Sequence, residues 1–573
     1  MTNGHNPTPV SSGLISRQWA TIGTTRTALL IAHNITTLSR LLDVLDIFDS
    51  DARIQIVFSA TESDPFRHEL VDELEKIGII TIPWAVAKNA EFDLAITASH
   101  HDKVTELFSP LVILSHGIGY TKYSPTRNQE PGTRNQEPGT RNQEPGTRNQ
   151  VFGLSPEWVL RQGKPAARAL VLSHDDQVAM LAAAAPAAVP AAVVAGDPCF
   201  DRIVASLPFR ERYRAALGIA DRILVYVSST WSDESTLGAR FDLLRSLLAE
   251  LPRDSYVVAT ALHPNISHHH GPGLIRRWLA DCMRSGLIIL PEIDDWRSGL
   301  IAADLIIGDN GSVTGYGAAI GRPTLLCAFP DVPDGTPVSE LGRLAGRLPA
   351  TGPLRKCIDK AIADHRPRYF DSVTDLVTSA PGQAHDRLRA LCYEILDLAP
   401  PPTETPARVL PAPTPHSTSA IFADEVTARS RLDTRLVQLV RRPAEIQRHG
   451  AWRPGLADGH LCSTIDYPML SIRTRADVLI ARSSDAGHDI WTTLLNILRD
   501  NPFCTIAAIV DGHRCRVAGR SGERVEMVTD GPADVLPSAV YAWAGDGRTL
   551  ASMAPGITVE LATSRWRVRV ECR

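Results

Sequence analysis

The sequence has no excess of basic residues, and this absence limits the partners that it attracts. Among its 573 residues, 64 are acidic and 59 are basic, which gives a formal net charge of -5. Proteins that bind nucleic acid or anionic membranes through their overall charge carry a basic surplus. The composition therefore argues against a nucleic-acid partner and against attraction of the whole chain to an anionic membrane.

The nine cysteines also lack the spacing of a metal site or a disulfide framework. They are scattered along the chain, and no two of them form a CxxC pair. Three adjacent histidines, 268–270, lie in a stretch that predicts a surface loop, where neighbouring side chains do not converge on one ion. We expect no metal site and no cofactor. The odd, dispersed cysteines suit a reducing cytosol.

A long, strongly apolar run is missing as well. The most apolar stretch, 178–196, is mostly alanine and contains Pro186 and Pro190, which would break a membrane-spanning helix. The N-terminal residues MTNGHNPTPVSSG are polar and lack the charged-then-apolar order of a signal peptide. We therefore expect a soluble, cytoplasmic protein that contacts a membrane only peripherally, if it contacts one.

What the chain does contain includes a tandem repeat, with three copies of TRNQEPG at 126–146. The seven-residue period lacks the apolar positions of a coiled coil, and every copy includes Pro and Gly. Such a segment buries too little apolar surface to offset the entropy of ordering it. We interpret it as a tandem expansion within a flexible surface loop, where insertions are well tolerated.

Apolar, β-branched runs alternate with amphipathic stretches over much of the chain, which predicts parallel strands separated by helices. The first set of strands is expected at 27–35, 53–60, 92–99, 111–119 and 167–174, with helices at 36–48 and 66–78. The pattern restarts with a strand at 221–230 and a helix at 236–251, and four more strand candidates follow up to Pro330. The fold class is therefore α/β, with two doubly wound, Rossmann-like lobes.

The remaining boundaries follow from composition. We expect a disordered tail at 1–26, an N-terminal lobe at 27–200, and a C-terminal lobe at 201–398 that is closed by helices at 353–365 and 383–398. A Pro-rich stretch at 399–417 predicts an exposed, semi-rigid linker. Residues 418–573 predict a smaller α+β domain of unknown role. Within this domain we expect a helix over 425–442 and strands over 503–512, 539–545 and 566–572.

Polar clusters directly follow several predicted strands, where parallel sheets bind their ligands. His116 in SHGIGYTKY precedes Gly-x-Gly and has the chemistry of a general base, although a hydrogen-bonded loop histidine is the alternative. Ser229 and Thr230 place hydroxyl groups before a helix, which suits a phosphate site. The alternative is a helix N-cap in this segment, with Ser232 or Asp233 accepting from the helix amides. His263 follows another strand and precedes a proline.

The last cluster, GDNGSVTGYGAAIGRPTLL at 308–326, runs from a strand into a helix of small residues. Backbone amides at that helix start, with the hydroxyls of Ser312 and Thr314, are suited to hold a diphosphate. The chain has no Walker lysine motif, which argues against ATP hydrolysis.

Together, these clusters resemble the motifs of the GT-B-fold CDP-glycerol glycerophosphotransferases of teichoic acid synthesis. That family has an HGTPLK-like motif, a GxPRxD-like segment, a PTWR-like segment, an HP after a strand, and TDYSSxxxDYxxxGRPxI. The corresponding segments here are HGIGYTK (116–122), AGDPCFDRI (195–203), SSTWSDE (228–234), LHP (262–264) and 308–326. The order and spacing agree over roughly residues 90–330, and the last motif is the most specific.

The resemblance implies roles for individual residues. His116 would deprotonate an acceptor hydroxyl, and His263 would contact the donor diphosphate or assist the leaving group. Lys122 would lie on the acceptor side, in the N-terminal lobe. The donor phosphate or nucleotide would bind in the C-terminal lobe, at Ser229, Thr230, Asp309, Asn310, Gly311, Ser312 and Thr314.

The implied reaction is metal-independent transfer of glycerol phosphate from CDP-glycerol to a hydroxyl group of a cell-envelope polymer. The acceptor would be polymeric or lipid-linked, and the enzyme would work in the cytoplasm at the inner face of the membrane. Two departures bear on the donor: Ser232 replaces the PTWR arginine, and Gly311 replaces the first serine of the SS pair. Loss of an arginine that faces phosphate weakens the case for this particular donor.

Two other functions remain open. An NDP-sugar glycosyltransferase or a UDP-sugar 2-epimerase on the same scaffold would fit the HPN and GRP elements nearly as well. A degenerate nucleotide-binding protein without turnover is favoured by the missing arginine and the extra C-terminal domain, but retention of both His116 and His263 argues against it.

Overall fold

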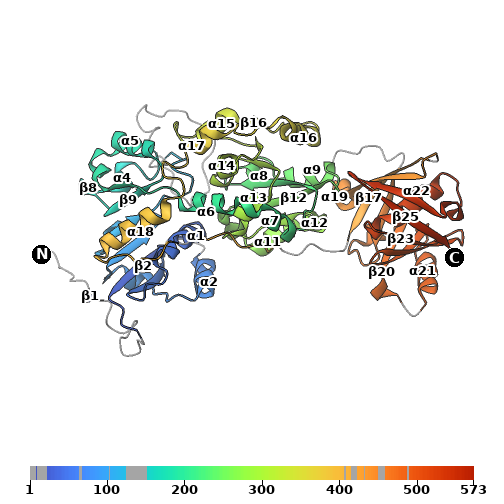
Figure 1. Ribbon diagram of the computed structural model, residues 1–573, viewed down its shortest axis with the longest axis horizontal. Helices are drawn as coiled ribbons and strands as arrows, with labels where there is room; N and C mark the ends of the chain where they lie inside the picture. The colour runs from blue at the N-terminus through green and yellow to red at the C-terminus, as the bar shows by residue number, and fades with distance from the viewer. Residues whose placement is uncertain are drawn as a thin grey trace, which may run out of the picture.

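The computed structural model describes residues 8–9, 22–62, 67–101, 104–115, 117–123, 151–405, 408–414, 422–431, 433–449, 459–486 and 489–573. Three parts follow one another along the long axis of the molecule: an N-terminal lobe, a C-terminal lobe and a barrel (Figure 1). The repeat at 126–146 lies outside the described residues. Most of the expected tail also lies outside the described residues. The described part of that tail includes Thr8–Pro9 (β1), which pairs in parallel with Ala90–Glu91 (β4).

The N-terminal lobe contains a six-stranded parallel sheet. Its strands are β2 (Arg26–Ala32), β3 (Ile54–Ala60), β5 (Leu94–Thr97), β6 (Leu111–Ile113), β9 (Ala169–Leu172) and β10 (Ala192–Val194), in the spatial order β10-β9-β6-β5-β2-β3. Helices α1 (Ile35–Val44) and α2 (Arg67–Ile77) pack on one face, and α5 (Asp175–Ala184) packs on the other. Burial of both faces explains why the strands are continuous apolar runs.

The C-terminal lobe has the order of a Rossmann fold. Its parallel strands are β11 (Ile223–Ser229), β12 (Tyr256–Leu262), β13 (Ile288–Ile289), β14 (Leu305–Gly308), β15 (Thr324–Leu326) and β16 (Gly346–Arg347), arranged β13-β12-β11-β14-β15-β16. The chain order reverses between β11 and β14, and such a switch point is where doubly wound sheets bind ligands. Two parallel α/β lobes are thus present, as the sequence predicts.

The helices of the C-terminal lobe cover both faces of this sheet. Those named below are α8 (Thr236–Ala239), α9 (Leu243–Glu250), α10 (Pro264–His270), α13 (Asp295–Ala302) and α14 (Ser312–Ala319). The expected helix at 236–251 is divided into α8 and α9 at residues 240–242. The histidine run 268–270, expected in a loop, instead lies in α10.

Helix α18 (Ala384–Ile395) does not close the C-terminal lobe as expected. Its apolar side chains Leu388, Cys392 and Tyr393 join the core of the N-terminal lobe, beside α1. The chain therefore crosses back to the first lobe after completing the second. Local amphipathicity predicts that this helix has a buried face, but it does not specify which lobe covers that face.

Most described residues of the Pro-rich linker are exposed, as expected, but two of its residues attach it to the surface of the molecule. Arg408 forms ion pairs with Asp46 and Asp49 of the N-terminal lobe, at 2.9 and 2.5 Å. Leu410 is buried, and its backbone amide donates to the Ser206 hydroxyl at 3.0 Å. Arg408 and Leu410 thus attach the linker to two segments, 46–49 and the region of Ser206, that lie far from it in the sequence.

The C-terminal part is a closed nine-stranded barrel and not a simple α+β domain. Around the barrel the strands run β17 (Ala423–Arg431), β18 (Leu436–Pro443), β24 (Gly556–Leu561), β25 (Ser564–Cys572), β23 (Arg524–Thr529), β22 (Arg514–Gly519), β21 (Ile506–Asp511), β20 (Val478–Arg482) and β19 (Gly459–Thr464). Helix α22 (Leu536–Gly545) packs its apolar side chains into one core with the barrel strands.

Two of the elements expected in this domain are wrong. The segment expected to be helical, 425–442, forms most of the β17–β18 hairpin. The segment AVYAWAG, expected as a strand, lies in α22. In the hairpin, inward residues such as Val426 and Val437 find their apolar partners on distant strands, so tertiary packing overrides the local pattern.

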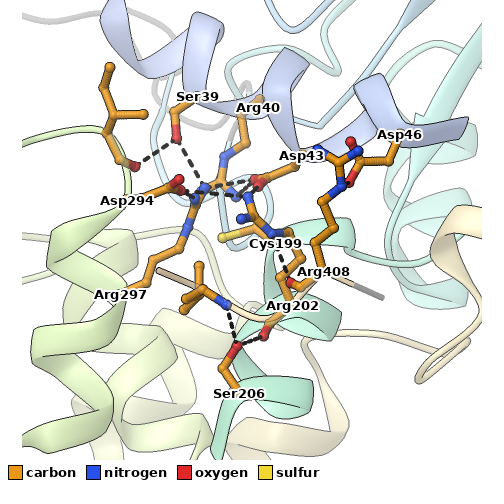
Figure 2. A network of polar contacts seen from close by, with 12 residues as sticks. Ser39, Arg40, Asp43, Asp46, Cys199, Arg202, Ser206, Asp294, Arg297 and Arg408 are labelled. Atoms are coloured by element: carbon orange, nitrogen blue, oxygen red, sulfur yellow. Dashed lines mark hydrogen bonds and ion pairs between the residues drawn. The ribbon is translucent and has the colours of Figure 1, made fainter. Parts of the chain in front are cut away.

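Ionic contacts join the three parts. Arg297 of α13 is fully buried and pairs with Asp43 of α1 at 2.7 Å, which connects the two lobes (Figure 2). Arg441 of the barrel pairs with Asp254 of the C-terminal lobe at 2.6 Å. None of the helices in the described part of the chain combines the length and apolarity that crossing a membrane requires.

Candidate functional site

Asp309 organises the switch point of the C-terminal sheet. Its carboxylate is fully buried directly after β14, and Oδ2 accepts hydrogen bonds from the Thr230 amide at 2.8 Å and the Thr230 hydroxyl at 2.9 Å. The same oxygen accepts from the Thr236 amide at the start of α8 at 2.9 Å, while Oδ1 accepts from the Gly311 amide at 3.0 Å. Asp309 therefore ties together the turns that follow β11 and β14.

Three other hydroxyl or imidazole groups of this region also serve local structure. The Ser229 hydroxyl donates to the Thr230 carbonyl at 2.8 Å and accepts from the Leu237 amide at 3.0 Å. Thr314 is fully buried and accepts from the Asp309 amide at 3.3 Å. His263 caps α10, because its Nδ1 accepts from the Asn265 amide at 3.1 Å.

His263 and Thr230 nevertheless follow two neighbouring strands that end at the same level of the sheet. Leu262 and Ser229, the residues before them, are register partners on the neighbouring strands β12 and β11. Adjacent strands lie about 4.8 Å apart, so these two residues begin at neighbouring positions on the carboxyl edge of the sheet. Together with Asp309, they place three of the predicted site residues on one edge.

Helix α14 begins at this edge with an N-cap that no side chain occupies. Gly311 is the N-cap residue and Ser312 is the first helical residue, so the first amides of α14 are not capped from their own turn. A Cβ on Gly311 would lie 2.6 Å from the Thr230 methyl group, which explains why a residue without a side chain stands there. Asn310 is buried between Asp309 and this helix start.

A loop from the N-terminal lobe sits on the first turn of α14. The Ile118 amide donates to the Ser312 hydroxyl at 3.4 Å, and a Cβ on Gly117 would lie 2.5 Å from that hydroxyl. A Cβ on Gly315 would lie 2.8 Å from the Ile118 side chain. Glycines at 117 and 315 thus permit close contact between the lobes. His116 lies outside the described residues, but its neighbour Gly117 touches Ser312.

Lys122 and Trp231 face each other across the lobe boundary. The Lys122 Nζ atom lies 5.8 Å from the centre of the Trp231 ring, within the range of a cation–π contact. The Lys122 side chain is exposed, yet the surrounding protein atoms lower its pKa, and the negative charge of Asp309 opposes that change. The boundary therefore brings a cation and an aromatic face close to the Asp309 turns.

Trp231 lies at the same boundary, and it is not among the site residues that the sequence predicts. About half of its side chain is exposed, and the next residue, Ser232, has a φ of 139°, which non-glycine residues rarely adopt. Backbone strain of this kind often accompanies functional turns. The signal in the sequence that could have indicated it is a tryptophan among the polar residues SSTWSDES.

Within the described part of the chain, no group of three or more His, Cys, Asp or Glu side chains has the geometry to hold a metal ion. The lobe boundary itself carries groups that can neutralise negative charge. These are the amides of α14, the Ser312 hydroxyl and the Lys122 ammonium group. All three are hydrogen-bond donors, which suits a site for phosphate oxygens.

No protein-family model matches the sequence, and no curated protein sequence matches it. Among solved structures, the chain is similar to the wall teichoic acid polymerase TagF, with 13% identity and a TM-score of 0.44 over 66% of this chain and 90% of the other. It is also similar to a putative UDP-N-acetylglucosamine 2-epimerase from Listeria monocytogenes (14% identity, TM-score 0.40, 66% and 98% covered).

A glycosyltransferase from Rickettsia africae is a third similar structure, with 10% identity and a TM-score of 0.37 over 65% of this chain and 100% of the other. Identities and TM-scores this low establish neither a family nor an activity.

Proposed function

We propose that the protein is a GT-B-type transferase that binds a nucleotide-diphosphate donor between its two lobes, with CDP-glycerol as the donor. The observation that carries this proposal is the contact of the Gly117–Ile118 loop with Ser312, beside the switch point of the C-terminal sheet. This contact brings Gly117, the residue that follows the proposed base His116 in the sequence, to the uncapped start of α14. A general base and a phosphate site would therefore share one boundary.

The donor diphosphate would bind at the start of α14. An uncapped helix N-terminus supplies amide donors and a positive partial charge, and Ser312 adds a hydroxyl. Thr230 and Asn310 flank this position, while Asp309, Ser229 and Thr314 hold the turns in place. Lys122 would neutralise phosphate charge from the other lobe, and the exposed face of Trp231 would stack on the nucleobase.

The reaction would be an in-line phosphoryl transfer. The acceptor hydroxyl oxygen would attack the phosphorus atom that carries glycerol, and its proton would pass to the imidazole of His116. The bond from that phosphorus to the bridging oxygen would break, and CMP would leave with His263 close to its phosphate. Catalysis of such a transfer depends on positioning and on donors that stabilise the developing charge.

A specific observation keeps the NDP-sugar alternative in view. Ser232, which replaces the arginine of the PTWR-like segment, stands in the turn beside Trp231. The donor site therefore carries one fixed positive charge fewer than the glycerophosphotransferase motif provides. If a UDP-sugar binds through the same α14 amides, the protein would be a glycosyltransferase or a 2-epimerase.

The test is a ligand panel followed by an assay of product release. CDP-glycerol at one hundred times its Kd is expected to stabilise the full chain by about 2.7 kcal/mol, visible as a raised Tm, and to release CMP when an acceptor is present. Ser312→Ala is expected to reduce the rate of CMP release 10- to 100-fold, because one phosphate donor is lost. Ser246→Ala, in α9 of the same lobe, is the matched control and is expected to retain the full rate.

The outcomes separate the three functions. Protection by UDP-sugars with UDP release or epimerisation would replace the glycerophosphotransferase with the NDP-sugar enzyme. Protection by a nucleotide without any turnover would indicate the degenerate binding protein. Absence of protection by every nucleotide tested would refute the donor site itself. His116→Ala with an unchanged rate at saturating donor would refute the assignment of the base.

A further inference from the structure

The C-terminal barrel carries arginines on the outer surface of four consecutive strands, β24, β25, β23 and β22. On β25, Val568 and Val570 belong to the barrel core, and the residues that alternate with them are exposed. Register pairing continues this outer surface across the sheet, because Arg569 lies opposite Val528, and Val528 lies opposite Arg514. We call this surface the arginine face. Its arginines used below are Arg514, Arg516, Arg565, Arg567, Arg569 and Arg573, which follows β25.

The acidic residues on the same strands do not balance this charge. The outward carboxylates of the four strands are Glu526, Glu560 and Glu571. Glu526 alone is the ion-pair partner of three of the arginines, with oxygen–nitrogen distances of 2.9 to 3.4 Å. Arg567 and Arg569 are exposed, and neither forms an ion pair within the described part of the chain. The strands therefore carry a local excess of positive charge, although the formal charge of the whole chain is -5.

The arginine face offers little to a membrane, a protein or a nucleic acid. Of the exposed large apolar side chains among the described residues, only Val528 lies on these four strands, whereas membrane insertion and stable protein interfaces need apolar anchors. The aromatic residue on these strands, Trp566, packs against the barrel core and closely approaches Gly531. Its ring is therefore not presented for stacking on nucleic-acid bases, which is the usual way of binding single strands.

The spacing of the arginines suits an extended chain of negative charges. Arg565, Arg567 and Arg569 form a row along β25, in which neighbouring members are about 6.8 Å apart, and strands lie about 4.8 Å apart. Arg514 flanks this row at a distance of two strands. Guanidinium groups stay charged and bind phosphate oxygens in bidentate geometry. A chain of phosphates laid along β25 can thus contact several arginines at once.

We propose that the arginine face binds a linear polyanion, a polyol or saccharide chain linked through phosphodiesters, and that it binds this chain by charge alone. The barrel follows the C-terminal lobe along the long axis of the molecule (Figure 1). Ion pairs of Asp424 and Arg441, on β17 and β18, join it to that lobe. The arginine face is therefore separate from the boundary between the two lobes, and the proposal does not rest on the proposed function.

Binding is measured on the full chain, without donor, by fluorescence anisotropy. The probe is a labelled oligomer of glycerol phosphate, titrated at several KCl concentrations. It is expected to bind the wild type, and the Kd is expected to rise with salt because binding releases counterions. If four arginines contact phosphates, the logarithm of the Kd should rise with the logarithm of the KCl concentration with a slope of about 3.

Two double variants test the role of charge in the row on β25. Arg567→Gln/Arg569→Gln removes two exposed charges and is expected to raise the Kd about 10-fold at low salt and to halve the slope. Arg567→Lys/Arg569→Lys keeps both charges and is expected to stay within about threefold of the wild-type Kd. Both variants should keep the wild-type Tm, because the replaced side chains are exposed.

The matched control removes two arginines from the same barrel but outside the four strands. Arg475 and Arg499 are exposed, so Arg475→Gln/Arg499→Gln lowers the charge of the barrel by the same amount. Its Kd and its slope are expected to equal those of the wild type. Protection by CDP-glycerol is expected to be unchanged in all of these variants, since the donor site lies in another part of the molecule.

Each other result overturns a stated part of the proposal. No binding to the wild type, an unchanged Kd in Arg567→Gln/Arg569→Gln, or an equal loss in the control variant overturns the arginine face. An equal loss in the Lys and Gln variants overturns binding by charge alone. Tighter binding of an oligothymidylate of equal charge replaces the polyol chain with a nucleic acid, and binding only to phosphatidylglycerol vesicles replaces it with a membrane. Absence of nucleotide protection refutes the proposed function and leaves the arginine face untouched.

Discussion

His460 on β19 is a single residue whose burial sets how the barrel responds to acid. Its ring packs against Tyr541 of α22 at a tilt of 31°, with centroids 4.3 Å apart, and Nε2 is buried without a hydrogen-bond partner in the described part of the chain. Burial lowers the pKa of His460 to about 3, far below the usual value of about 6.5. The folded barrel thus requires the neutral imidazole.

The sign of the pH dependence follows from linkage. Because the unfolded chain takes up a proton near pH 6.5 and the folded chain does not, the stability is complete above that pH and falls as the pH decreases toward 3. The loss is about 1.4 kcal/mol per pH unit below the unfolded pKa. We expect urea unfolding at pH 5 and pH 7.5 to differ by less in His460→Leu than in the wild type.

The control for this prediction is His513, which is exposed in the turn between β21 and β22. His513→Leu is expected to keep the full pH dependence of the wild-type barrel. If His460→Leu and His513→Leu show the same difference between the two pH values, other buried groups and not His460 determine the acid sensitivity.

At the scale of elements, the loop at 115–119 and helix α14 form the contact on which the proposed site depends. Gly117 has a φ of 98°, and a Cβ there would meet the Ser312 hydroxyl. Gly117→Ala therefore adds a steric clash to backbone strain. We expect the backbone strain to cost about 1 kcal/mol of folding stability. We also expect the clash to raise the Kd for the donor nucleotide at least 10-fold, which a thermal-shift titration would show.

Gly163 offers a matched control for the backbone term. It lies in the same lobe with a φ of 76°, but an added Cβ would meet nothing within 4 Å. Gly163→Ala is expected to lose a similar folding stability in a denaturant titration while nucleotide protection is retained. Equal nucleotide protection in both variants would show that the loop contact does not shape the donor site.

The same scale shows how much of the fold the sequence predicts. Strands such as β2, β3 and β11 are predicted because a strand buried on both faces is a continuous apolar run. The β17–β18 hairpin and α22 are misread, since barrel closure supplies their partners from strands distant in sequence. Short strands such as β16, with two residues, leave no pattern to read.

The sequence predicts the candidate site only in part, as it does the fold. Residues after strands, such as Thr230, His263 and Asp309, are located by the rule that ligands bind at carboxyl edges. The contact between Lys122 and Trp231 is not, because these residues belong to different lobes and only the folded chain brings them together. The sequence predicts Ser229 and Thr314 as phosphate ligands, whereas in the folded protein their hydroxyl groups accept hydrogen bonds from backbone amides of the same region.

For the whole molecule, a buried ionic network is one of the contacts that join the two lobes (Figure 2). Arg297 is fully buried and donates to Asp43 and Ser39 of α1 at 2.7 and 3.0 Å, and to Asp294 at 2.5 Å. Removing one partner of a buried pair leaves an uncompensated charge, which typically costs about 3–5 kcal/mol. Arg297→Met should therefore weaken the junction far more than an exposed pair would.

We expect this loss to appear as reduced cooperativity between the lobes. In the wild type, calorimetry should show the two lobes unfolding in one transition, because each lobe buries charged groups of the other. In Arg297→Met, the transition should broaden or divide, since two domains that are less strongly coupled unfold more independently. Asp364→Ala, which breaks the exposed ion pair with Lys360 on α16 (Leu354–Asp364), is the control and should change stability by less than about 1 kcal/mol. A single, unshifted transition in Arg297→Met would mean that the apolar contacts of the junction suffice to couple the lobes, and that the network contributes specificity of alignment rather than strength.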